Sequence, residues 1–290
     1  MAEHEKRMAI CPVCPHQCLL SEGKTGKCRA RGMKDGKIIP LNYGIATSLA
    51  LDPIEKKPLA RFYPGGKILS IGSYGCNLKC PFCQNWEISM SDGREYCQGR
   101  RADERFLTPE ALAETAKQLR ARGNIGVAFT YNEPLISYEY VLDTAKYLKE
   151  SDLKTVLVTN GCINEEIASL VLPVTDALNI DLKSFQETVY RKTLGGNLAT
   201  VQRFIEKAAE QCHVDLTSLI VPGMNDSDEE MLAMTQWIAS LPGGNEIPLH
   251  ITRFFPRYRV LDKKPTDRSV ILRLVGVARQ QLKHVYPGNI

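Results

Sequence analysis

Short runs rich in Val, Ile and Leu recur along the chain from residue 67 onward, and each run is nearly continuous in apolar residues. Such runs are typical of strands that are buried on both faces of a sheet. The strands predicted in this way span 67–73, 124–130, 154–160, 176–183, 213–222 and 247–254.

The longer segments between these runs repeat their apolar residues at helical spacing. The predicted helices span 108–123, 135–150, 164–172, 198–212, 227–241 and 266–284. Two of them begin with recognisable end signals: Thr108 precedes Pro109 as a cap, and Ser227 with Glu230 predicts a capping box. Alternation of strands and helices with crossovers of this length predicts a parallel α/β fold.

Six strand–helix units in series favour a partial or full parallel (β/α)6 barrel of the TIM-like kind, with its chemistry at the carboxyl ends of the strands. Residues 1–66 do not follow the alternation. We therefore predict a small Cys-rich amino-terminal segment with a connector over 1–66, in which 1–35 form a knuckle, and a barrel core over 67–290.

Composition and net charge argue against several functional classes. Of the 290 residues 43% are apolar and 24% are charged, which suits a globular protein. The net charge of +4 is too small to indicate a nucleic-acid partner. The first residues, MAEHEKRMAICPV, carry charges where a secretion signal needs an apolar run, and no stretch is long enough to cross a bilayer. We expect a cytoplasmic protein with no nucleic-acid or membrane partner.

Seven of the ten cysteines gather in two groups, which indicates metal ligation in a reducing compartment. The group after the first predicted strand, SYGCNLKCPFCQNW, has the spacing Cys76-x3-Cys80-x2-Cys83. Three thiolates could each bind one iron of a four-iron cluster and leave one iron open to a small chelating ligand. A zinc site or three structural thiols are the alternatives.

With Phe82 before its last cysteine, this CxxxCxxC motif resembles the radical SAM superfamily. Together with six other stretches it resembles the AmmeMemoRadiSam-system enzymes, which are related to pyruvate formate-lyase activating enzymes. The seven stretches are LDPIEKKPLARFYPG (51–65), SYGCNLKCPFCQNWEIS (73–89), TYNEP (130–134), VTNG (158–161), NIDLKSF (179–185), VPGMND (221–226) and PLHITRFFPRY (248–258).

The resemblance implies a [4Fe-4S] cluster on Cys76, Cys80 and Cys83 and S-adenosylmethionine (SAM) as its ligand. It also implies reductive cleavage of SAM to a 5′-deoxyadenosyl radical, which then abstracts a hydrogen atom from an unidentified substrate. A flavodoxin-like or ferredoxin-like electron donor and companion proteins of the AmmeMemoRadiSam system are the partners that it implies.

The same resemblance places SAM contacts around the cluster and at the strand ends. Phe82 would contact adenine, and Glu133, with Asn132 beside it, would accept a hydrogen bond from the ammonium group of SAM. The family usually has Gly-Gly where this chain has Tyr131-Asn132, so a close backbone approach is not assured here. After the third predicted strand, Thr159 and Asn160 are polar contacts, for which a capped strand end is the alternative.

Asp181 and Lys183 lie on one face of the fourth predicted strand. Buried charges are costly unless they are used, so Lys183 would pair with the methionine carboxylate while Asp181 orients it or binds a hydroxyl. A plain ion pair at a solvent-exposed edge is the alternative. His250 has apolar neighbours, which is typical of a core histidine, whereas the resemblance implies a contact on the adenosine side.

The amino-terminal group has the spacing Cys11-x2-Cys14-x3-Cys18-x9-Cys28, with glycines that allow tight turns. Four thiols suit either structural zinc or a second iron–sulfur cluster, and the spacing does not decide between them.

Three functions are consistent with the sequence. A radical SAM enzyme could act on a small molecule or a partner-borne residue, or on a protein glycine as a glycyl-radical-enzyme activase. A non-enzymatic iron–sulfur or zinc redox sensor would account for the cysteines, but it leaves Glu133, Asp181 and Lys183 without a role.

Overall fold

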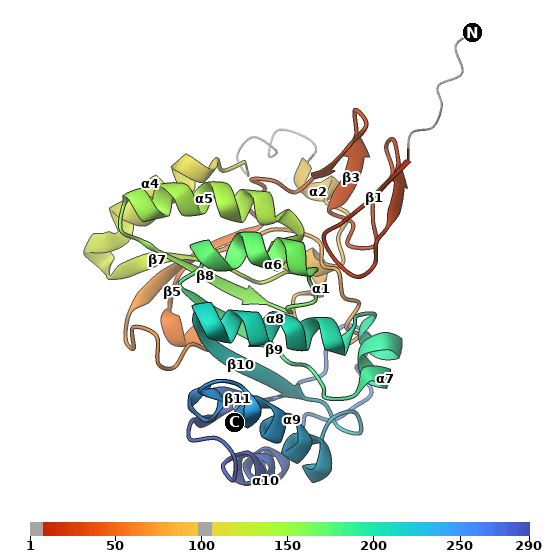
Figure 1. Ribbon diagram of the computed structural model, residues 1–290, viewed down its shortest axis with the longest axis vertical. Coiled ribbons are helices and arrows are strands. Elements are labelled where there is room, and N and C mark those ends of the chain that lie inside the picture. The colour runs from red at the N-terminus through yellow and green to blue at the C-terminus, as the bar shows by residue number, and fades with distance from the viewer. Residues whose placement is uncertain (1–7, 98–105) are drawn as a thin grey trace.

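The computed structural model describes residues 8–97 and 106–290, so the first seven residues of the predicted amino-terminal segment lie outside the description. Its main feature is an eight-stranded sheet in the order β12-β11-β10-β9-β8-β7-β6-β5 (Figure 1). All neighbouring strands from β6 to β12 are parallel, and β5 pairs antiparallel with β6 at one edge. The strands are β5 (Ser48–Pro53), β6 (Lys67–Gly72), β7 (Asn124–Phe129), β8 (Lys154–Thr159), β9 (Ala177–Asp181), β10 (His213–Ile220), β11 (Leu249–Arg253) and β12 (Val285–Gly288).

The six predicted strands are confirmed as β6 to β11, and the sheet adds one strand at each end. Among the described residues β5 and β12 do not pair with each other, so the barrel is partial rather than full. Apolar side chains of the central strands are fully buried, among them Leu157, Leu178 and Leu216. This burial explains why the strands lack a polar face in the sequence.

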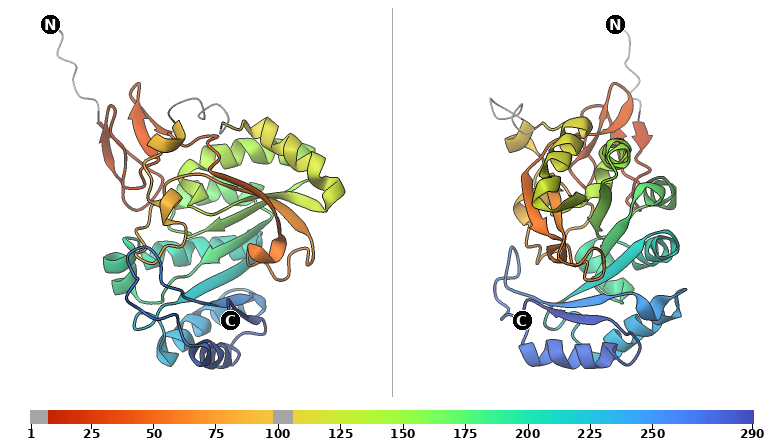
Figure 2. Two further views of the ribbon diagram at one scale, coloured as in Figure 1. Left: turned by 180° about the vertical axis from the view of Figure 1, so that it is seen from behind. Right: turned by 90° about the vertical axis from the view of Figure 1, so that its left-hand side faces the viewer.

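Helices follow the strands, as the alternation predicts. Figure 1 shows α5, α6 and α8 lying side by side across one face of the sheet, and Figure 2 shows the same layer from two other directions. The α-helices are α1 (Trp86–Ser89), α2 (Arg94–Cys97), α4 (Pro109–Gln118), α5 (Tyr138–Glu150), α6 (Glu165–Val171), α7 (Glu187–Val189), α8 (Leu198–Gln211), α9 (Asp228–Ser240) and α10 (Arg268–Ala278). None of the helices in the described part of the chain is both long and apolar enough to span a bilayer.

The predicted helix caps are confirmed in one case and half confirmed in the other. The Thr108 side chain accepts a hydrogen bond from the backbone of Ala111 at the start of α4. Ser227 likewise caps α9, but the carboxylate of Glu230 does not complete a capping box. It accepts hydrogen bonds from Ser184 Oγ at 2.6 Å and from the Phe185 backbone at 2.7 Å, and it thereby joins α9 to the loop after β9.

The amino-terminal segment forms two small antiparallel hairpins beside the sheet (Figure 2). One pairs β1 (Met8–Ile10) with β2 (Leu19–Ser21), and the other pairs β3 (Arg31–Lys34) with β4 (Lys37–Pro40). The buried Arg31 guanidinium makes two hydrogen bonds of 2.8 and 2.9 Å to the carboxylate of Glu139 on α5, which attaches the segment to the core. Farther along, the predicted connector contributes β5 to the main sheet.

Candidate functional site

A cavity of about 730 Å³ lies at the carboxyl ends of the central strands. The loop after β6 and the ends of β7, β8 and β9 form one part of its wall, and β10 to β12 with the segment 55–60 form the rest. Every residue predicted to hold the [4Fe-4S] cluster or SAM lines it: Cys76, Cys80, Phe82, Cys83, Asn132, Glu133, Thr159, Asn160, Asp181, Lys183 and His250. The four amino-terminal cysteines do not line this cavity.

The cysteine loop follows β6, with Cys76 four residues after Gly72, and presents three free thiols to the cavity. Burial raises the pKa of Cys76, and it raises the pKa of Cys80 to about 11 although the charge of Lys183 acts in the opposite direction. The Cys76 sulfur accepts a hydrogen bond from the Leu78 backbone at 3.4 Å. These sulfurs can be thiolates only when a positive partner compensates their burial, as an iron centre does.

The chemistry of this donor set, three thiols on one loop, suits a cluster better than a single ion. No three Cys, His, Asp or Glu side chains in the described residues converge closely enough to hold one metal ion. Zinc would draw its thiolates to about 2.3 Å from one centre, whereas a four-iron cluster gives each thiolate its own iron. The donor set therefore fits a four-iron cluster on Cys76, Cys80 and Cys83.

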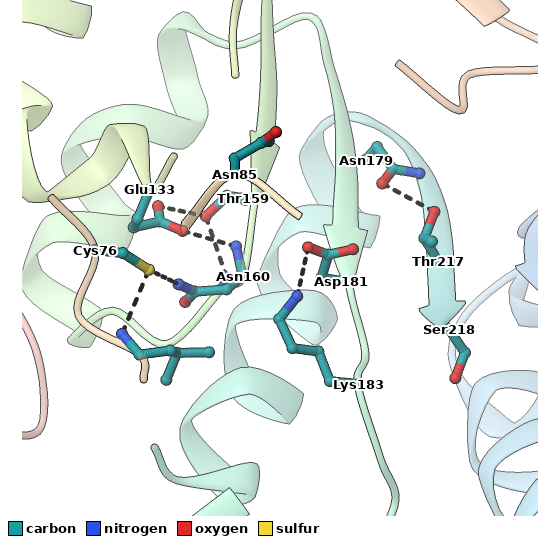
Figure 3. Close-up of polar contacts among 12 residues, drawn as sticks. Cys76, Asn85, Glu133, Thr159, Asn160, Asn179, Asp181, Lys183, Thr217 and Ser218 are labelled. Atoms are coloured by element: carbon teal, nitrogen blue, oxygen red, sulfur yellow. Dashed lines mark hydrogen bonds and ion pairs between the residues drawn. The ribbon is translucent and has the colours of Figure 1, made fainter. Parts of the chain in front are cut away.

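Glu133 is the most buried carboxylate at the cavity and ties two strand ends together (Figure 3). Its Oε1 accepts hydrogen bonds from Thr159 Oγ1 at 2.7 Å and from the Leu135 backbone at 3.0 Å, and its Oε2 accepts from the Asn160 backbone at 2.8 Å. Burial raises the pKa of Glu133 to about 7, against these hydrogen bonds, which favour the charged form. One acceptor position on Oε2 is left for a donor in the cavity.

Asn160 connects the end of β8 to the cysteine loop (Figure 3). Its Nδ2 donates to Asn77 Oδ1 at 2.9 Å and to the Cys76 sulfur at 3.6 Å. Asn132 acts similarly from the end of β7, since its Nδ2 donates to the carbonyls of Tyr74 and Gly75 at 3.2 and 3.0 Å. Both amides thus hold the loop that carries the cysteines, in addition to lining the cavity.

Tyr131 occupies the position where the resembling family has glycine, and it takes the left-handed conformation that glycine favours, with φ of 71°. Gly72 makes this possible, because a Cβ at Gly72 would lie 2.8 Å from the Tyr131 ring. The substitution of Tyr for Gly is therefore accommodated by close packing against β6.

Asp181 and Lys183 form an ion pair of 2.7 Å that faces the cavity (Figure 3). Burial alone would lower the pKa of Lys183, but the charge of Asp181 outweighs it and raises the pKa. The Lys183 side chain is 17% exposed and that of Asp181 is 33% exposed, so both charges remain accessible from the cavity. The pair therefore lies where a ligand in the cavity can reach it.

His250 lines the cavity, and Asp215 fixes its orientation. Asp215 is fully buried and accepts hydrogen bonds of 2.8 Å from Nε2 of both His250 and His213, and one of 3.0 Å from the Ala60 backbone. The pKa of Asp215 is lowered, because these hydrogen bonds outweigh the effect of its burial. An ionised Asp215 keeps the proton of His250 on Nε2 and leaves Nδ1 for other partners.

Comparison with known proteins identifies the family of this chain. The profile of the Radical SAM superfamily matches residues 70–238, which is more than half of the chain and includes the whole cysteine loop. The chain belongs to the radical SAM superfamily.

Two curated relatives and one solved structure illustrate the relationship. "Uncharacterized protein MJ0808" of Methanocaldococcus jannaschii is 36% identical over 282 residues, which are 97% of this chain and 81% of the relative. The pyruvate formate-lyase 1-activating enzyme of Escherichia coli K12 is 22% identical over 71% of this chain and 86% of its own length. Streptococcus suis SuiB bound to S-adenosylmethionine has a similar fold, with a TM-score of 0.55 and 15% identity over 75% of this chain and 48% of SuiB.

This radical SAM protein is therefore an enzyme, related to activating enzymes, that uses a [4Fe-4S] cluster and SAM. When bound and reduced, the cluster supplies the electron that cleaves SAM into methionine and a 5′-deoxyadenosyl radical. The protein's own part is to bind, orient and shield these groups, because a carbon radical must meet only its target.

The radical SAM cavity also has a polar group that the sequence reasoning did not single out. Lys57 is buried, 2.9 Å from Asp52, and its Nζ lies 4.5 Å from the centre of the Tyr131 ring. The Tyr131 hydroxyl donates to the same Asp52 oxygen at 2.8 Å, so the three side chains form one network. Apart from the LDPIEKKP stretch, which resembles the family, no sequence signal marks this contact, since 74 residues separate Lys57 from Tyr131.

Proposed function

We propose that this enzyme belongs to the AmmeMemoRadiSam system and uses its radical on a small polar substrate that binds beside SAM in the same cavity. The observation that carries the proposal is the amount of polar lining beyond the residues assigned to the cluster and SAM. Lys57, Thr217 and Thr252 line the cavity there. The Lys57 ammonium and both hydroxyls donate to protein acceptors, and the hydroxyl oxygens can in addition accept hydrogen bonds from a substrate. The seven stretches that resemble the system support the assignment to it.

Each residue predicted to bind SAM would contact the part of SAM that suits its chemistry. Lys183 would pair with the methionine carboxylate, because its charge faces the cavity beside Cys80, while Asp181 would orient Lys183 or bind a hydroxyl. Glu133 would accept from the ammonium at its remaining acceptor position. Phe82 would pack on adenine, and His250, oriented by Asp215, would contact the adenosine side.

Replacing Lys183 with Met tests the carboxylate contact. We expect the KM for SAM to rise about thirtyfold or more, since removing one partner of a buried charge pair costs at least ~2 kcal/mol. The measurement is 5′-deoxyadenosine formation by the reduced enzyme over a range of SAM concentrations. Lys154→Met is the matched control, because Lys154 pairs with Asp176 at 3.0 Å and does not line the cavity. An unchanged KM in Lys183→Met would remove Lys183 from the SAM site.

A second candidate function is activation of a glycyl-radical enzyme, which the relationship to pyruvate formate-lyase activating enzymes favours. A glycine residue has only its backbone groups to offer to the polar lining around Lys57 and Thr217. This mismatch is the reason that we place the small molecule first.

The two targets can be separated by one experiment on the reduced, reconstituted enzyme with SAM. Small-molecule and macromolecular fractions of an extract of the source organism are added separately, and 5′-deoxyadenosine and protein radicals are measured. We expect the small-molecule fraction alone to stimulate 5′-deoxyadenosine formation. A stable protein radical that requires the macromolecular fraction would favour the activase instead.

Reduction of the cluster requires an external electron donor, and we propose a flavodoxin-like or ferredoxin-like protein in this role. We further propose that the companion proteins of the AmmeMemoRadiSam system supply the substrate or use the product. Stimulation of turnover by a purified companion protein is the direct measurement.

A further inference from the structure

The predicted knuckle, residues 1–35, is described from residue 8 onward and contains four cysteines that the radical chemistry at the cavity does not use. Cys11, Cys14 and Cys28 are buried, Cys18 is partly exposed, and all four are free thiols. Cys14 is close enough to Cys11 and Cys28 for their charges to interact. Three buried thiols in one short segment without disulfide bonds are more than packing requires.

Backbone amides point at these sulfurs. The Lys27 amide donates to the Cys18 sulfur at 3.4 Å, which is the same distance as from the Leu78 amide to Cys76 in the cluster loop. The His16 amide acts on Cys14 and the Ala30 amide on Cys28, in both cases from two residues farther along the chain. Leu78 stands in the same relation to Cys76.

This arrangement fits ligating sulfurs. A thiol is a weak acceptor, whereas a thiolate bound to a metal gains from amide donors that share its negative charge. The knuckle thus repeats at Cys14 and Cys28 the local geometry that the chain uses at a cysteine of its known cluster motif.

The knuckle is also fixed against the cluster loop. The His16 ring hydrogen bonds to the Asn77 carbonyl at 2.8 Å, and the Arg29 guanidinium donates to the Cys76 carbonyl at 3.3 Å. A Cβ on Gly75 would lie 2.7 Å from the Cys28 carbonyl oxygen, so the two backbones are in contact beside Cys76. A group bound to the knuckle would therefore be a neighbour of the first cluster.

The arrangement of the thiols favours iron–sulfur over zinc. In the described residues, no three side chains in the knuckle approach the tight arrangement that one metal ion needs. The same is true of Cys76, Cys80 and Cys83, the predicted ligands of the four-iron cluster that this superfamily uses. A cluster gives each thiolate its own iron and so does not need the thiols to converge on one point, which makes it the better match to the knuckle.

We propose that Cys11, Cys14, Cys18 and Cys28 bind a second four-iron cluster with protein ligands on all of its irons. With four thiolates this cluster keeps no open iron, so it does not bind SAM. It differs in this respect from the cluster at Cys76, Cys80 and Cys83.

The test is the metal content of three anaerobically purified full-length proteins. These are the wild type, a Cys76/Cys80/Cys83→Ala variant with an intact knuckle, and a Cys11/Cys14/Cys18/Cys28→Ser variant. We expect about eight irons and eight sulfides per chain in the wild type and about four of each in either variant. Cys212→Ser serves as the control, since the Cys212 thiol donates to the carbonyls of Leu172 and Thr175 and lies outside both cysteine groups, and it should keep the wild-type content.

The triple alanine variant is decisive because its knuckle is unchanged. About four irons with a cluster absorption and a reduced-state electron paramagnetic resonance signal would support the proposal, whereas about one zinc, or no metal, would overturn it. One zinc, or no metal, in this variant would not contradict the proposed radical function. Cleavage of SAM depends on Cys76, Cys80 and Cys83, which are intact in the wild type. Should the serine variant fold poorly, the iron content of the triple alanine variant alone decides.

Discussion

Alanine in place of any one of Cys76, Cys80 and Cys83 is expected to lower 5′-deoxyadenosine formation at least about a hundredfold, with loss of iron. Changes to residues that merely support a metal ligand cost about 10- to 100-fold, and a ligand itself should cost no less. All three thiols line the cavity in which Glu133, Asp181 and Lys183 also lie. Iron content and 5′-deoxyadenosine are measured together after anaerobic reconstitution.

Cys162→Ala is the informative control for these variants. Cys162 is 2% exposed and follows the end of β8, but its thiol does not line the cavity. We expect it to keep the iron and most of the activity. Retention of full activity in Cys80→Ala or Cys83→Ala would contradict the three-thiolate cluster.

Glu133→Ala is expected to lower the free energy of unfolding by about 3 kcal/mol. The substitution leaves the amides of Leu135 and Asn160 and the hydroxyl of Thr159 without their acceptor in a buried place, and each unsatisfied donor costs about 1–3 kcal/mol. Chemical denaturation at constant pH gives the value. Glu165→Ala, at an exposed carboxylate on α6, is the control and should change stability by less than about 0.5 kcal/mol. Equal stability of the two variants would show that the hydrogen bonds to Glu133 do not stabilise the fold.

Glu133 also predicts a dependence of stability on pH. Burial raises its pKa from 4.5 to about 7, so between these values the unfolded chain releases the proton before the folded chain does. The unfolded state then binds fewer protons, and the free energy of unfolding falls as pH rises through this window. The expected loss is about 3 kcal/mol between pH 4.5 and 7, at about 1.4 kcal/mol per pKa unit. Glu133→Gln, which does not titrate, should be less dependent on pH over this range, and an identical slope would refute the assignment.

The central strands and most of the helix positions were predictable, because burial on both faces leaves long apolar runs. β5 and β12 were not, since SLALDP and VYPG are short, contain proline and lie at the sheet edges, where polar residues are tolerated. The predicted side chains at the strand ends also meet at one cavity, since parallel strands bring their carboxyl ends to one edge.

Contacts between distant segments could not be predicted from the sequence. Asp215 looks like any acid in a strand until the fold places His213 and His250 on either side of it. Asn132 has an amide that could face a ligand, and only the structure reveals that it holds the carbonyls of Tyr74 and Gly75. Sequence reasoning recognises which chemistry a residue type allows, while long-range packing decides which partner it meets.

The cavity wall at 55–60 and 286–289 comes from segments that flank the superfamily match at 70–238 on both sides. Part of the cavity wall therefore lies outside the stretch that carries Cys76, Cys80 and Cys83. Changes in these flanks could alter which molecule the cavity admits without touching the cysteine loop.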